Sequence, residues 1–375
     1  MSDWFGKDVF KLGFGLMRLP KLEDGKSIDI EQTSKMVDLF IEAGGTYFDT
    51  AYVYDEGRSE EAARKALVDR YPRDKYTLCT KMNAWFGTPD EAAVKQQLQT
   101  SLERTGAGYF DYYLLHSIQR NNIDKYDNYG LWDLVKEQKE KGLIKYWGFS
   151  FHDDAEFLDE LLTAHPDVDF VQLQINYADM ENPDVQSKAC YEVARKHGVS
   201  ITVMEPIKGG VLADPIPQVK DIFTKANPDL SPASWAVRYA ASLEGVITVL
   251  SGMSNIEQME DNLSYMKDFK PLTEEEVKVV DAAKAAMDAV ETIKCTACHY
   301  CTEGCPMNIP IPEIFAARNQ QLVYNQIEGA KRRYAGITKD KGKASDCIAC
   351  GQCESACPQH LGIIDYLKEC VTNLE

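Results

Sequence analysis

Eight of the eleven cysteines in this chain stand in two runs of the same spacing. Each run reads C-x-x-C-x-x-C-x-x-x-C-P, so three closely spaced cysteines are followed by a fourth that precedes a proline. This spacing places cysteine thiolates around a [4Fe–4S] cluster, and its repetition predicts two such clusters. The first run comprises Cys295, Cys298, Cys301 and Cys305, and the second comprises Cys347, Cys350, Cys353 and Cys357.

The fourth cysteine of such a run commonly ligates the cluster of the other run. We therefore expect Cys357 to complete the site that the first run begins, and Cys305 to complete the site of the second run. Two zinc ribbons, or a set of disulfide bridges, are the alternative interpretation of eight cysteines. Zinc sites seldom show four cysteines in this spacing, which favours iron–sulfur clusters.

The remaining cysteines, Cys79, Cys190 and Cys370, show no partner spacing. Unpaired thiols together with iron-binding runs are typical of a reducing compartment, so we expect a cytoplasmic protein. The first six residues lack the basic and apolar regions of a secretion signal. No apolar run approaches the roughly 18 residues that a membrane span needs. The sequence thus predicts a soluble protein that is not exported and has no membrane partner.

The charge of the chain limits its partners. Its 375 residues include 41 Lys and Arg against 59 Asp and Glu, which gives a formal net charge of −18 at pH 7. A negative field of this size repels phosphate backbones, and no basic face is large enough to offset it. The composition therefore argues against nucleic acid as a partner.

The segment before the cysteines alternates short apolar runs with amphipathic stretches eight times, which is typical of βα units and predicts a (β/α)8 TIM barrel. An open, doubly wound sheet is the competing fold. It usually carries G-x-G-x-x-G after its first strand, whereas Gly13 and Gly15 lie inside the expected first strand. The expected strands are residues 12–17, 46–49, 76–81, 110–116, 144–150, 170–175, 200–204 and 246–250.

Two domains are expected from this organisation. Residues 1–290 would form the barrel, closed by a helix rich in Lys, Glu and Ala, and residues 291–375 would form a small ferredoxin-like domain. Between the cysteine runs, residues 311–334 are mostly good helix formers with proline only at the beginning, which predicts one helix. The tail is therefore expected to be a mostly helical ferredoxin.

Polar side chains stand at the carboxyl ends of three consecutive expected strands, where barrels place their active sites. They are Asp49, Lys81 and His116, and Tyr54 follows in the loop after Asp49. An ion pair of Lys81 with Asp49 beside a phenol would favour the tyrosinate and lower the pKa of Tyr54. Tyr54 could then protonate a carbonyl oxygen that His116 also reaches.

These residues fall in motifs that resemble the aldo-keto reductases over roughly residues 11–262. The resemblance implies an NAD(P)H-dependent oxidoreductase that reduces an aldehyde or ketone, or oxidises the alcohol, through an Asp-Tyr-Lys-His tetrad. The tail resembles the two-cluster module of iron–sulfur members of that family. The matching motifs are Asp49-Thr50-Ala51-x-x-Tyr54, Gly57-x-Ser59-Glu60, Thr80-Lys81, Asp111-x-x-Leu114-Leu115-His116 and Gly148-Phe149-Ser150.

The resemblance also implies contacts to the nicotinamide cofactor. Ser150 and Gln172 match the anchors of the carboxamide, Asn262 matches an adenine contact, and Met204 stands where many members stack a tyrosine on the nicotinamide. The loop after the eighth strand lacks the Lys and Arg common in NADP-preferring members, so NAD and NADP both stay open, and a bound flavin is a further alternative. The full set is Gly15, Met17, Ser150, Gln172, Met204, Gly252, Met253, Ser254, Gln258 and Asn262.

Two hypotheses for the role of the clusters stay open. Nicotinamide transfers its electrons as a pair, so one-electron carriers connect to it poorly without a flavin. The clusters would either relay electrons from a ferredoxin or another redox partner, or stabilise the tail as structural groups. The alternative to a carbonyl reductase is an electron-transfer protein whose barrel is a scaffold. Substrate specificity would reside in residues 117–129 and 208–227.

Overall fold

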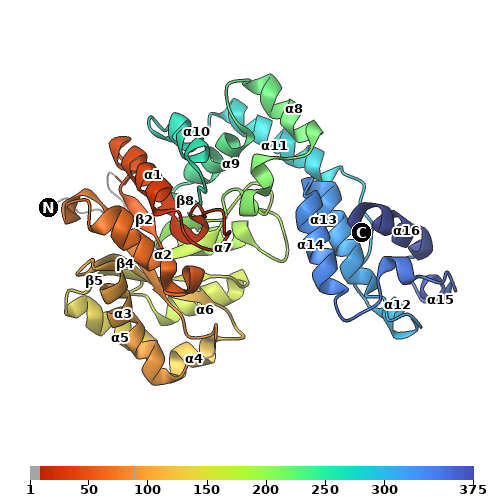
Figure 1. The fold of residues 1–375 in the computed structure, drawn as a ribbon, viewed down its shortest axis with the longest axis horizontal. Coiled ribbons are helices and arrows are strands. Elements are labelled where there is room, and N and C mark those ends of the chain that lie inside the picture. Colours follow the sequence, from red (N-terminus) through yellow and green to blue (C-terminus); the bar gives the residue numbers. More distant parts are fainter. Residues whose placement is uncertain (1–8, 88) are drawn as a thin grey trace. The chain divides into compact units, whose positions relative to one another are not determined.

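The computed structural model describes residues 9–87 and 89–375 and divides into two compact units (Figure 1). The first unit comprises the chain up to residue 209 together with residues 233–277, and the second comprises residues 210–232 and 278–375. This division differs from a boundary at residue 290, which stays a prediction. The first six residues, from which we expect no secretion signal, lie outside the described range.

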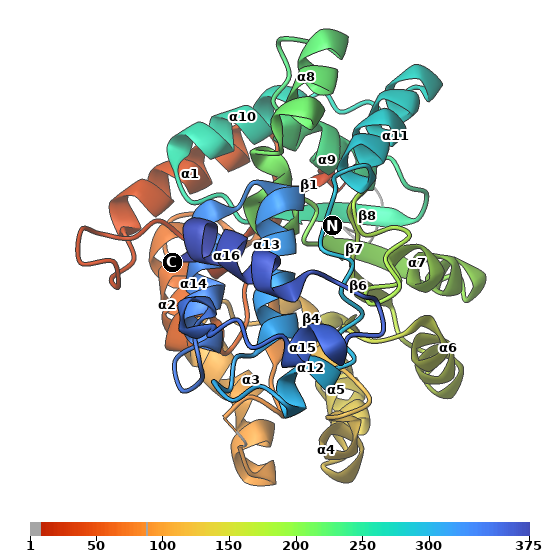
Figure 2. The same cartoon turned by 90° about the vertical axis from the view of Figure 1, so that its right-hand side faces the viewer.

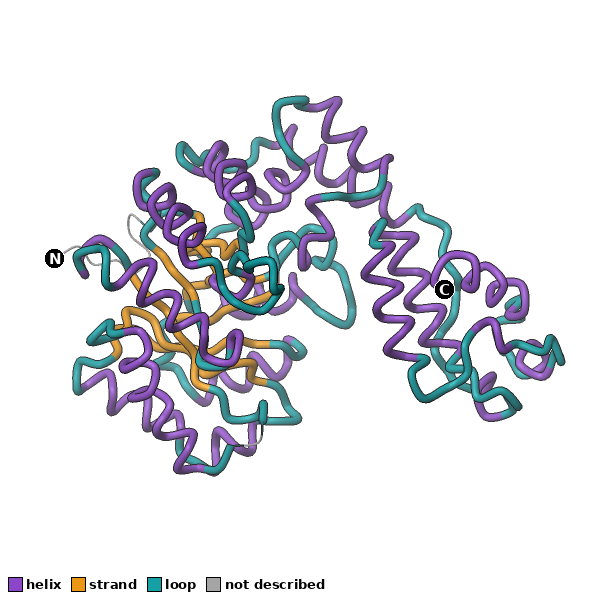
Figure 3. Tube along the Cα trace, in the orientation of Figure 1, coloured by secondary structure: helices purple, strands orange, loops and turns teal. Residues whose placement is uncertain are grey.

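Eight parallel strands close into a barrel in sequence order, and the first strand pairs with the last. The predicted barrel is therefore confirmed, and Figure 3 shows its strands enclosed by helices. Every strand lies within two residues of its predicted position. The strands are β1 (Leu12–Gly15), β2 (Tyr47–Asp49), β3 (Thr77–Met82), β4 (Phe110–Ile118), β5 (Ile144–Phe151), β6 (Phe170–Gln174), β7 (Ser200–Met204) and β8 (Val246–Ser251).

Two strand ends differ from the prediction. The strand β1 ends at Gly15, because Leu16–Arg18 turns into a 3-10 helix. The strand β4 continues past His116 to Ile118, with an irregular register after Leu115. Ser117 in this irregular stretch adopts the left-handed conformation, with a φ of 58°. Both departures lie at the carboxyl end of the barrel, where the predicted site residues gather.

The helices of the first unit lie between successive strands, and many begin at a capped residue. Asp29, Asp90, Asp154 and Asn255 each accept a backbone N–H of the first turn with the side chain. The helices are α1 (Ile30–Glu42), α2 (Arg58–Ala63), α3 (Glu91–Thr105), α4 (Ile123–Asn128), α5 (Leu131–Glu140), α6 (Ala155–Ala164), α7 (Ser187–Lys196), α9 (Pro232–Ala241) and α10 (Ile256–Met266).

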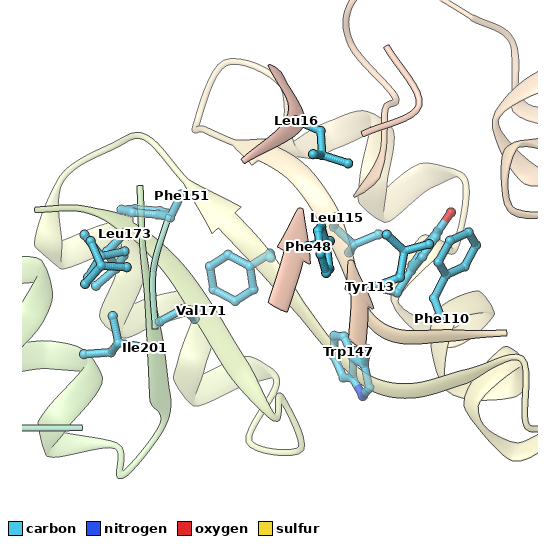
Figure 4. Close-up of a cluster of buried hydrophobic side chains, with 14 of the residues drawn as sticks. Leu16, Phe48, Phe110, Tyr113, Leu115, Trp147, Phe151, Val171, Leu173 and Ile201 are labelled. Carbon is cyan, nitrogen blue, oxygen red and sulfur yellow. The ribbon is translucent and has the colours of Figure 1, made fainter. Parts of the chain in front are cut away.

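Successive side chains of each strand point alternately to the surrounding helices and to the interior of the barrel, as the period of two requires. Side chains such as Leu115, Val171 and Leu173 belong to the large cluster that strands and helices share (Figure 4). The other side chains of the strands fill the barrel interior as a separate cluster. That cluster consists of Tyr47, Cys79, Tyr112, Leu114, Phe170, Ile247 and Leu250.

This alternation positions the predicted site. Continuing the inward set by two residues toward the carboxyl end leads from Tyr47 to Asp49, from Cys79 to Lys81 and from Leu114 to His116. The aromatic and aliphatic residues thus form the floor of the barrel, and the polar residues lie above it. The sequence spacing of two is the reason that residues from three strands share one face.

One glycine in the barrel has no possible replacement without movement of the backbone. A Cβ on Gly148 of β5 would lie 1.9 Å from the carbonyl oxygen of Phe170 on β6. These two residues are direct partners in the ladder of β5 and β6. Gly148 therefore permits the close approach that places Ser150, two residues later, at the barrel mouth.

The second unit contains only helices, turns and loops within the described chain. Its helices are α8 (Pro217–Ala226), α12 (Tyr300–Glu303), α13 (Ile311–Tyr324), α14 (Ile327–Ile337), α15 (Gln352–Ser355) and α16 (Ile363–Leu374), and α11 (Glu274–Asp288) begins in the first unit. The expectation of a mostly helical tail is confirmed. The single helix predicted for residues 311–334 is wrong, because Asn325 adopts the left-handed conformation, with a φ of 54°, and separates two helices.

The two cysteine runs belong to an internal structural repeat with a separation of 52 residues. This separation relates Cys295 to Cys347 and the first residue of α13, Ile311, to the first residue of α16, Ile363. The short helices α12 and α15 obey the same separation and lie side by side (Figure 2). The two helices α13 and α16 also pack on one another. The repeat of the sequence is thus a repeat of the fold.

Within the described residues, none of the helices is long and apolar enough to cross a membrane.

Candidate active site and cluster pockets

A buried ion pair lies at the centre of the predicted catalytic residues. The ammonium nitrogen of Lys81 lies 2.5 Å from Oδ1 of Asp49 and donates a second hydrogen bond of 2.7 Å to the carbonyl oxygen of Thr50. Lys81 has no exposed surface, and Asp49 is 3% exposed. Burying such a pair costs several kcal/mol of desolvation for each ion, so hydrophobic residues would serve stability at least as well.

Tyr54 and His116 lie against this pair. The Lys81 ammonium nitrogen is 4.9 Å from the ring centroid of Tyr54. The rings of Tyr54 and His116 meet edge to face, with centroids 5.7 Å apart and planes at 77°. The structure therefore brings together all four residues that the sequence predicts to be catalytic.

The turn after Tyr54 is strained. Asp55 and Glu56 both adopt left-handed φ values, 51° and 58°, although neither is glycine. Ion pairs of Asp55 with Lys21 at 2.5 Å and with Arg58 at 2.8 Å hold this turn in place. Left-handed residues of this kind cluster at functional sites, because the surroundings must stabilise them. The left-handed turn directly follows the phenol that lies beside the ion pair.

Burial, more than charge, sets the protonation of the site. Burial raises the pKa of Tyr54 above its ordinary value, and the Lys81 charge only partly opposes that rise. The expected lowering of the Tyr54 pKa is therefore wrong. Burial alone would lower the pKa of Lys81, but Asp49 and Tyr54 raise it above its ordinary value. Burial and the Lys81 charge lower the pKa of His116 well below its ordinary value, so this imidazole is neutral at pH 7.

Two of the residues implied as cofactor contacts lie beside the tetrad. Gln172 on β6 donates from Nε2 to Oδ2 of Asp49 at 3.4 Å. The hydroxyl of Ser150 accepts the backbone N–H of Ser117 at 2.6 Å, which leaves its own hydrogen available as a donor. Both side chains are buried. Ser150 and Gln172 thus border the same polar mouth from β5 and β6.

The loop between β8 and α10 contains three of the implied contacts, Gly252, Met253 and Ser254, and α10 contains two more, Gln258 and Asn262. Oε1 of Gln258 accepts the backbone N–H of Ser254 at 2.7 Å, so the loop folds back on the first turn of α10. Met253 is buried and Asn262 is 5% exposed, whereas Gln258 is exposed. The N-terminal end of a helix of eleven residues offers backbone N–H groups that favour an anion. The positive charge at this end of the loop thus comes from backbone N–H groups alone, because residues 251–262 contain no Lys or Arg.

The last implied contacts lie at the ends of other strands. Gly15 ends β1, and Met17 in the following turn exposes 57% of its surface. Met204 ends β7, is half-buried and precedes Glu205, which adopts a left-handed φ of 56°. Gly252 follows β8 directly. The residues of the implied set therefore lie in or directly after β1, β5, β6, β7 and β8, except Gln258 and Asn262, which lie in α10.

The eight run cysteines divide between two pockets in the second unit. Cys295, Cys298, Cys301 and Cys357 line one pocket, together with Ile311, Phe315 and Ile363. Cys305, Cys347, Cys350 and Cys353 line the other, together with Ile309, Ile348 and Leu367. Each pocket holds about 330 Å³ of space free of atoms, which includes the solvent at its mouth. The fourth cysteine of each run thus contributes to the pocket of the other run.

The lining of both pockets combines thiols with apolar side chains. Four cysteines line each pocket, beside Ile311, Phe315 and Ile363 in one and Ile309, Ile348 and Leu367 in the other. Four cysteine thiolates are the ligand set of a [4Fe–4S] cluster.

The backbone of both cluster loops follows the 52-residue repeat. Residues at equivalent positions in the two runs share the left-handed conformation, which turns each loop around its pocket. The third such position of each copy follows the fourth cysteine by three residues. The pairs are Ala297 with Ala349, His299 with Gly351 and Asn308 with His360, and their φ values lie between 51° and 78°.

Comparison with known proteins decides the family. A family model described as "Aldo/keto reductase family" matches residues 11–285, more than half of the chain. The chain belongs to the aldo/keto reductase family. A second model, described as "4Fe-4S dicluster domain", matches residues 294–361. The protein is therefore an oxidoreductase of this family with a C-terminal 4Fe–4S dicluster domain.

Relatives of the reductase match its barrel. The uncharacterized oxidoreductase YqkF of Bacillus subtilis (strain 168) is 26% identical over 73% of this chain and 92% of its own length. The aldo-keto reductase str7 of Strobilurus tenacellus is 27% identical over 72% of this chain and 88% of its own. The holo form of AKR11C1 from Bacillus halodurans has a TM-score of 0.56 and 25% identity, covering 73% of this chain and 91% of that one.

A solved aldo-keto reductase from Klebsiella pneumoniae in complex with NADPH shares the fold of the barrel, with a TM-score of 0.59. Its identity to this reductase is 21%, over 73% of this chain and 90% of its own. The matched portion in each of these comparisons is about three quarters of the chain.

One residue of the reductase that the sequence reasoning missed is Arg18. Its side chain is exposed and passes 3.5 Å from the position of a Cβ on Gly252 and 3.8 Å from the corresponding position on Gly209. It therefore extends from the turn after β1 across the loops that follow β7 and β8. It forms no ion pair among the described residues, unlike most cations of the barrel. The position of Arg18 directly after Met17, an implied cofactor contact, is the sequence feature that could have identified it.

Two acidic residues in the quoted motifs of the reductase serve its structure. Glu60 is fully buried, where it accepts hydrogen bonds from Thr80 at 2.7 Å and Arg104 at 3.1 Å. Asp111 is the second residue of β4, at the opposite end from His116, and pairs with Arg73 and Lys145. A family motif thus contains residues for the fold as well as for the reaction.

Proposed function

We propose that this protein reduces a small aldehyde or ketone with hydride from a nicotinamide cofactor, or oxidises the corresponding alcohol, through Asp49, Tyr54, Lys81 and His116. The single observation that carries this proposal is the fully buried ammonium of Lys81 between Asp49 and the ring of Tyr54. Burying an ion pair is costly, and a barrel that served only as a scaffold would not need one. A catalytic phenol that loses and regains a proton does need a fixed positive charge beside it, because that charge stabilises the phenolate.

Two buried polar atoms support a nicotinamide and a carbonyl at this mouth. Within the described part of the chain, Nδ1 of His116 and Oδ1 of Asn262 have no hydrogen-bond partner. The Asn262 oxygen can accept the amino group of adenine, and the hydroxyl of Ser150 and the amide of Gln172 can hold the carboxamide. A cofactor bound there supplies hydride to the carbonyl carbon. The residues present therefore fit the group that the family implies.

Tyr54 completes the reduction by proton transfer. As negative charge develops on the carbonyl oxygen, the Tyr54 hydroxyl donates its proton, and solvent later restores it. Because burial raises the pKa of Tyr54, the phenol is protonated at neutral pH and ready to donate. Lys81, kept charged by Asp49, stabilises the phenolate that forms. The neutral imidazole of His116 orients the oxygen without competing as an acid.

We further propose NADH as the preferred cofactor. Residues 251–262, which contain the loop after β8 and the first half of α10, include no Lys or Arg but include Glu257, Glu260 and Asp261. A 2′-phosphate needs cationic donors to offset its charge and its desolvation. The acidic side chains of this segment disfavour it, whereas a free ribose needs no such donor.

For the second unit we propose two [4Fe–4S] clusters with exchanged fourth ligands. Cys295, Cys298, Cys301 and Cys357 would hold one, and Cys347, Cys350, Cys353 and Cys305 the other. Such clusters supply one-electron storage. The grouping of the thiols in two separate pockets supports this assignment.

The test of the reductase function is Tyr54→Phe in the cluster-loaded protein. We expect a loss of about 10² to 10⁴ in kcat for carbonyl reduction, with unchanged iron content and unchanged NADH affinity. Tyr113→Phe is the matched control, because Tyr113 is buried in β4 and its hydroxyl has no hydrogen-bond partner among the described residues. A wild-type protein that binds no nicotinamide, yet exchanges electrons with a ferredoxin, would instead support the scaffold hypothesis.

A further inference from the structure

A segment of the second unit reverses the charge of the chain locally. Residues 331–343 contain six cationic side chains and one acidic one, a net charge of +5 in a protein whose total is −18. The segment covers the end of α14 and the loop that leads to the second cysteine run. Its cations are Lys331, Arg332, Arg333, Lys339, Lys341 and Lys343.

These cations are available to a partner. Lys331 is half-buried and the other five are exposed. None of the six forms an ion pair within 4 Å to a described residue, and Arg333 contacts only an amide oxygen of Gln320. Cations of the barrel such as Lys21 and Lys139 do have such partners. The charge of Lys343 contributes to lowering the pKa of the Glu375 carboxyl, but since none of the six is held in an ion pair, their charge is accessible to an acidic partner.

The basic loop lies at the pocket that contains most of the second cysteine run. The backbone N–H of Gly342 donates to the carbonyl oxygen of Asn308 at 3.1 Å, and a Cβ on Gly342 would lie 2.1 Å from the carbonyl oxygen of Met307. Met307 itself lines this pocket, and Lys343 precedes Cys347 by four residues. The loop that carries Lys341 and Lys343 is therefore packed directly on the wall of the pocket.

Two apolar side chains at the same pocket are exposed to solvent. Ile348 exposes 61% of its surface and Met307 exposes 37%, and both line the pocket. Cys350 of this pocket is also exposed. An apolar centre beside a charged rim is the composition of a protein interface, since the rim steers a partner and the centre excludes water.

The internal repeat provides a comparison within the same chain. Residues 279–291, which stand 52 positions before the basic segment, contain one cation and three acids, a net charge of −2. That one cation, Lys284, pairs with Asp288 at 2.5 Å. The basic charge thus precedes the second run alone, although the two runs share their fold.

From this asymmetry we infer that the surface formed by Met307, Ile348 and the loop Lys339–Lys343 binds a small acidic electron-carrier protein. This inference rests on the proposed clusters, because the carrier is defined by what it does there: it gives up or takes one electron, with no bond made or broken. The positive charge of the surface favours an acidic partner. Because the surface adjoins the pocket of the second cysteine run, we infer that this partner is a redox protein. The reduced carrier loses the electron that the chain gains, so the exchange balances without another reactant.

The experiment measures binding of a strongly acidic [2Fe–2S] ferredoxin to the full, cluster-loaded chain by isothermal titration calorimetry at low and high salt. We compare wild type with the triple variant Lys339→Glu, Lys341→Glu and Lys343→Glu. The expected result is at least about tenfold weaker binding for this variant, with a smaller salt dependence. A basic cytochrome c, used as the charge-inverted probe, should bind the variant better than wild type.

The matched control reverses three exposed lysines of the first unit, Lys65, Lys267 and Lys270, none of which forms an ion pair among the described residues. It changes the net charge by the same amount and should leave ferredoxin binding within about twofold of wild type. Equal weakening by both triples would overturn the inference, as would tighter binding of a single-stranded oligonucleotide than of ferredoxin. Iron content and NADH-dependent carbonyl reduction, measured on the same samples, separate failure of this surface from failure of the proposed function.

Discussion

The ammonium nitrogen of Lys81 lies 4.9 Å from the ring centroid of Tyr54 and has no contact with solvent. A charge that water does not screen acts strongly on the phenol beside it. Because burial raises the Tyr54 pKa while Lys81 lowers it, the two effects oppose each other, and burial prevails. This balance has a measurable consequence.

Reduction requires protonated Tyr54, so its rate should stay constant at neutral pH and fall only as pH rises through the Tyr54 pKa. Since that pKa lies above the ordinary value of 10.0, the wild-type profile should remain flat to about pH 10. In Lys81→Met the fall should move to still higher pH, because the lowering charge is lost, and kcat should drop by about 10² or more. The measurement is kcat for reduction between pH 6 and 11, with Tyr113→Phe as control. A wild-type rate that falls below pH 9 would contradict the direction of this shift.

The exchange of fourth cysteines can be tested by pairs of serine substitutions. Cys305→Ser with Cys347→Ser removes two ligands from one pocket, and we expect about half of the iron to remain. Cys357→Ser with Cys347→Ser removes one ligand from each pocket, and we expect both clusters to be weakened or lost. Iron analysis and EPR of the reduced proteins distinguish the two cases. If each run held its own cluster, the second pair would lose one cluster and the first pair would lose both.

Gly148→Ala should destabilise the barrel. The new Cβ would meet a backbone carbonyl at 1.9 Å, so β5 and β6 must separate, which costs about 1–3 kcal/mol or more. Gly336→Ala in α14 is the control, because its Cβ would meet nothing within 4 Å and alanine favours a helix. Thermal melting should show a lower Tm for the first variant and no decrease for the second. Equal Tm values for Gly148→Ala and wild type would refute the steric argument.

Arg18→Ala tests whether the unpaired cation across the loops after β7 and β8 holds the cofactor. We expect KM for NADH to rise by about tenfold, which corresponds to one charge-assisted contact, while kcat stays within about twofold. Arg18→Lys should restore part of the affinity, because the charge returns without the planar guanidinium. Steady-state kinetics with NADH and NADPH at saturating substrate measure both quantities. A fall in kcat with unchanged KM would place Arg18 in the reaction instead of in binding.

The sequence alone was sufficient for the parts of this protein that local spacing encodes. Eight alternations of strand and helix specified the barrel, because the two periods, 2 and 3.6, depend only on neighbouring residues. The spacing of the cysteines indicated the dicluster domain for the same reason. The polar residues at successive strand ends indicated which side chains would lie together, since parallel strands in a barrel present their carboxyl ends on one face, and their catalytic role is our proposal.

Only the tertiary structure decided the features that depend on surroundings from distant parts of the chain. The direction of the Tyr54 pKa follows from how deeply the phenol is buried, which no spacing reveals. The helix break at Asn325, between α13 and α14, occurs at a residue that is neither proline nor glycine, so the sequence did not predict it. The basic loop before Cys347 acquires meaning only because Gly342 packs on Met307 at the cluster pocket. Burial and packing depend on contacts between residues far apart in the sequence, and these contacts form only in the folded chain.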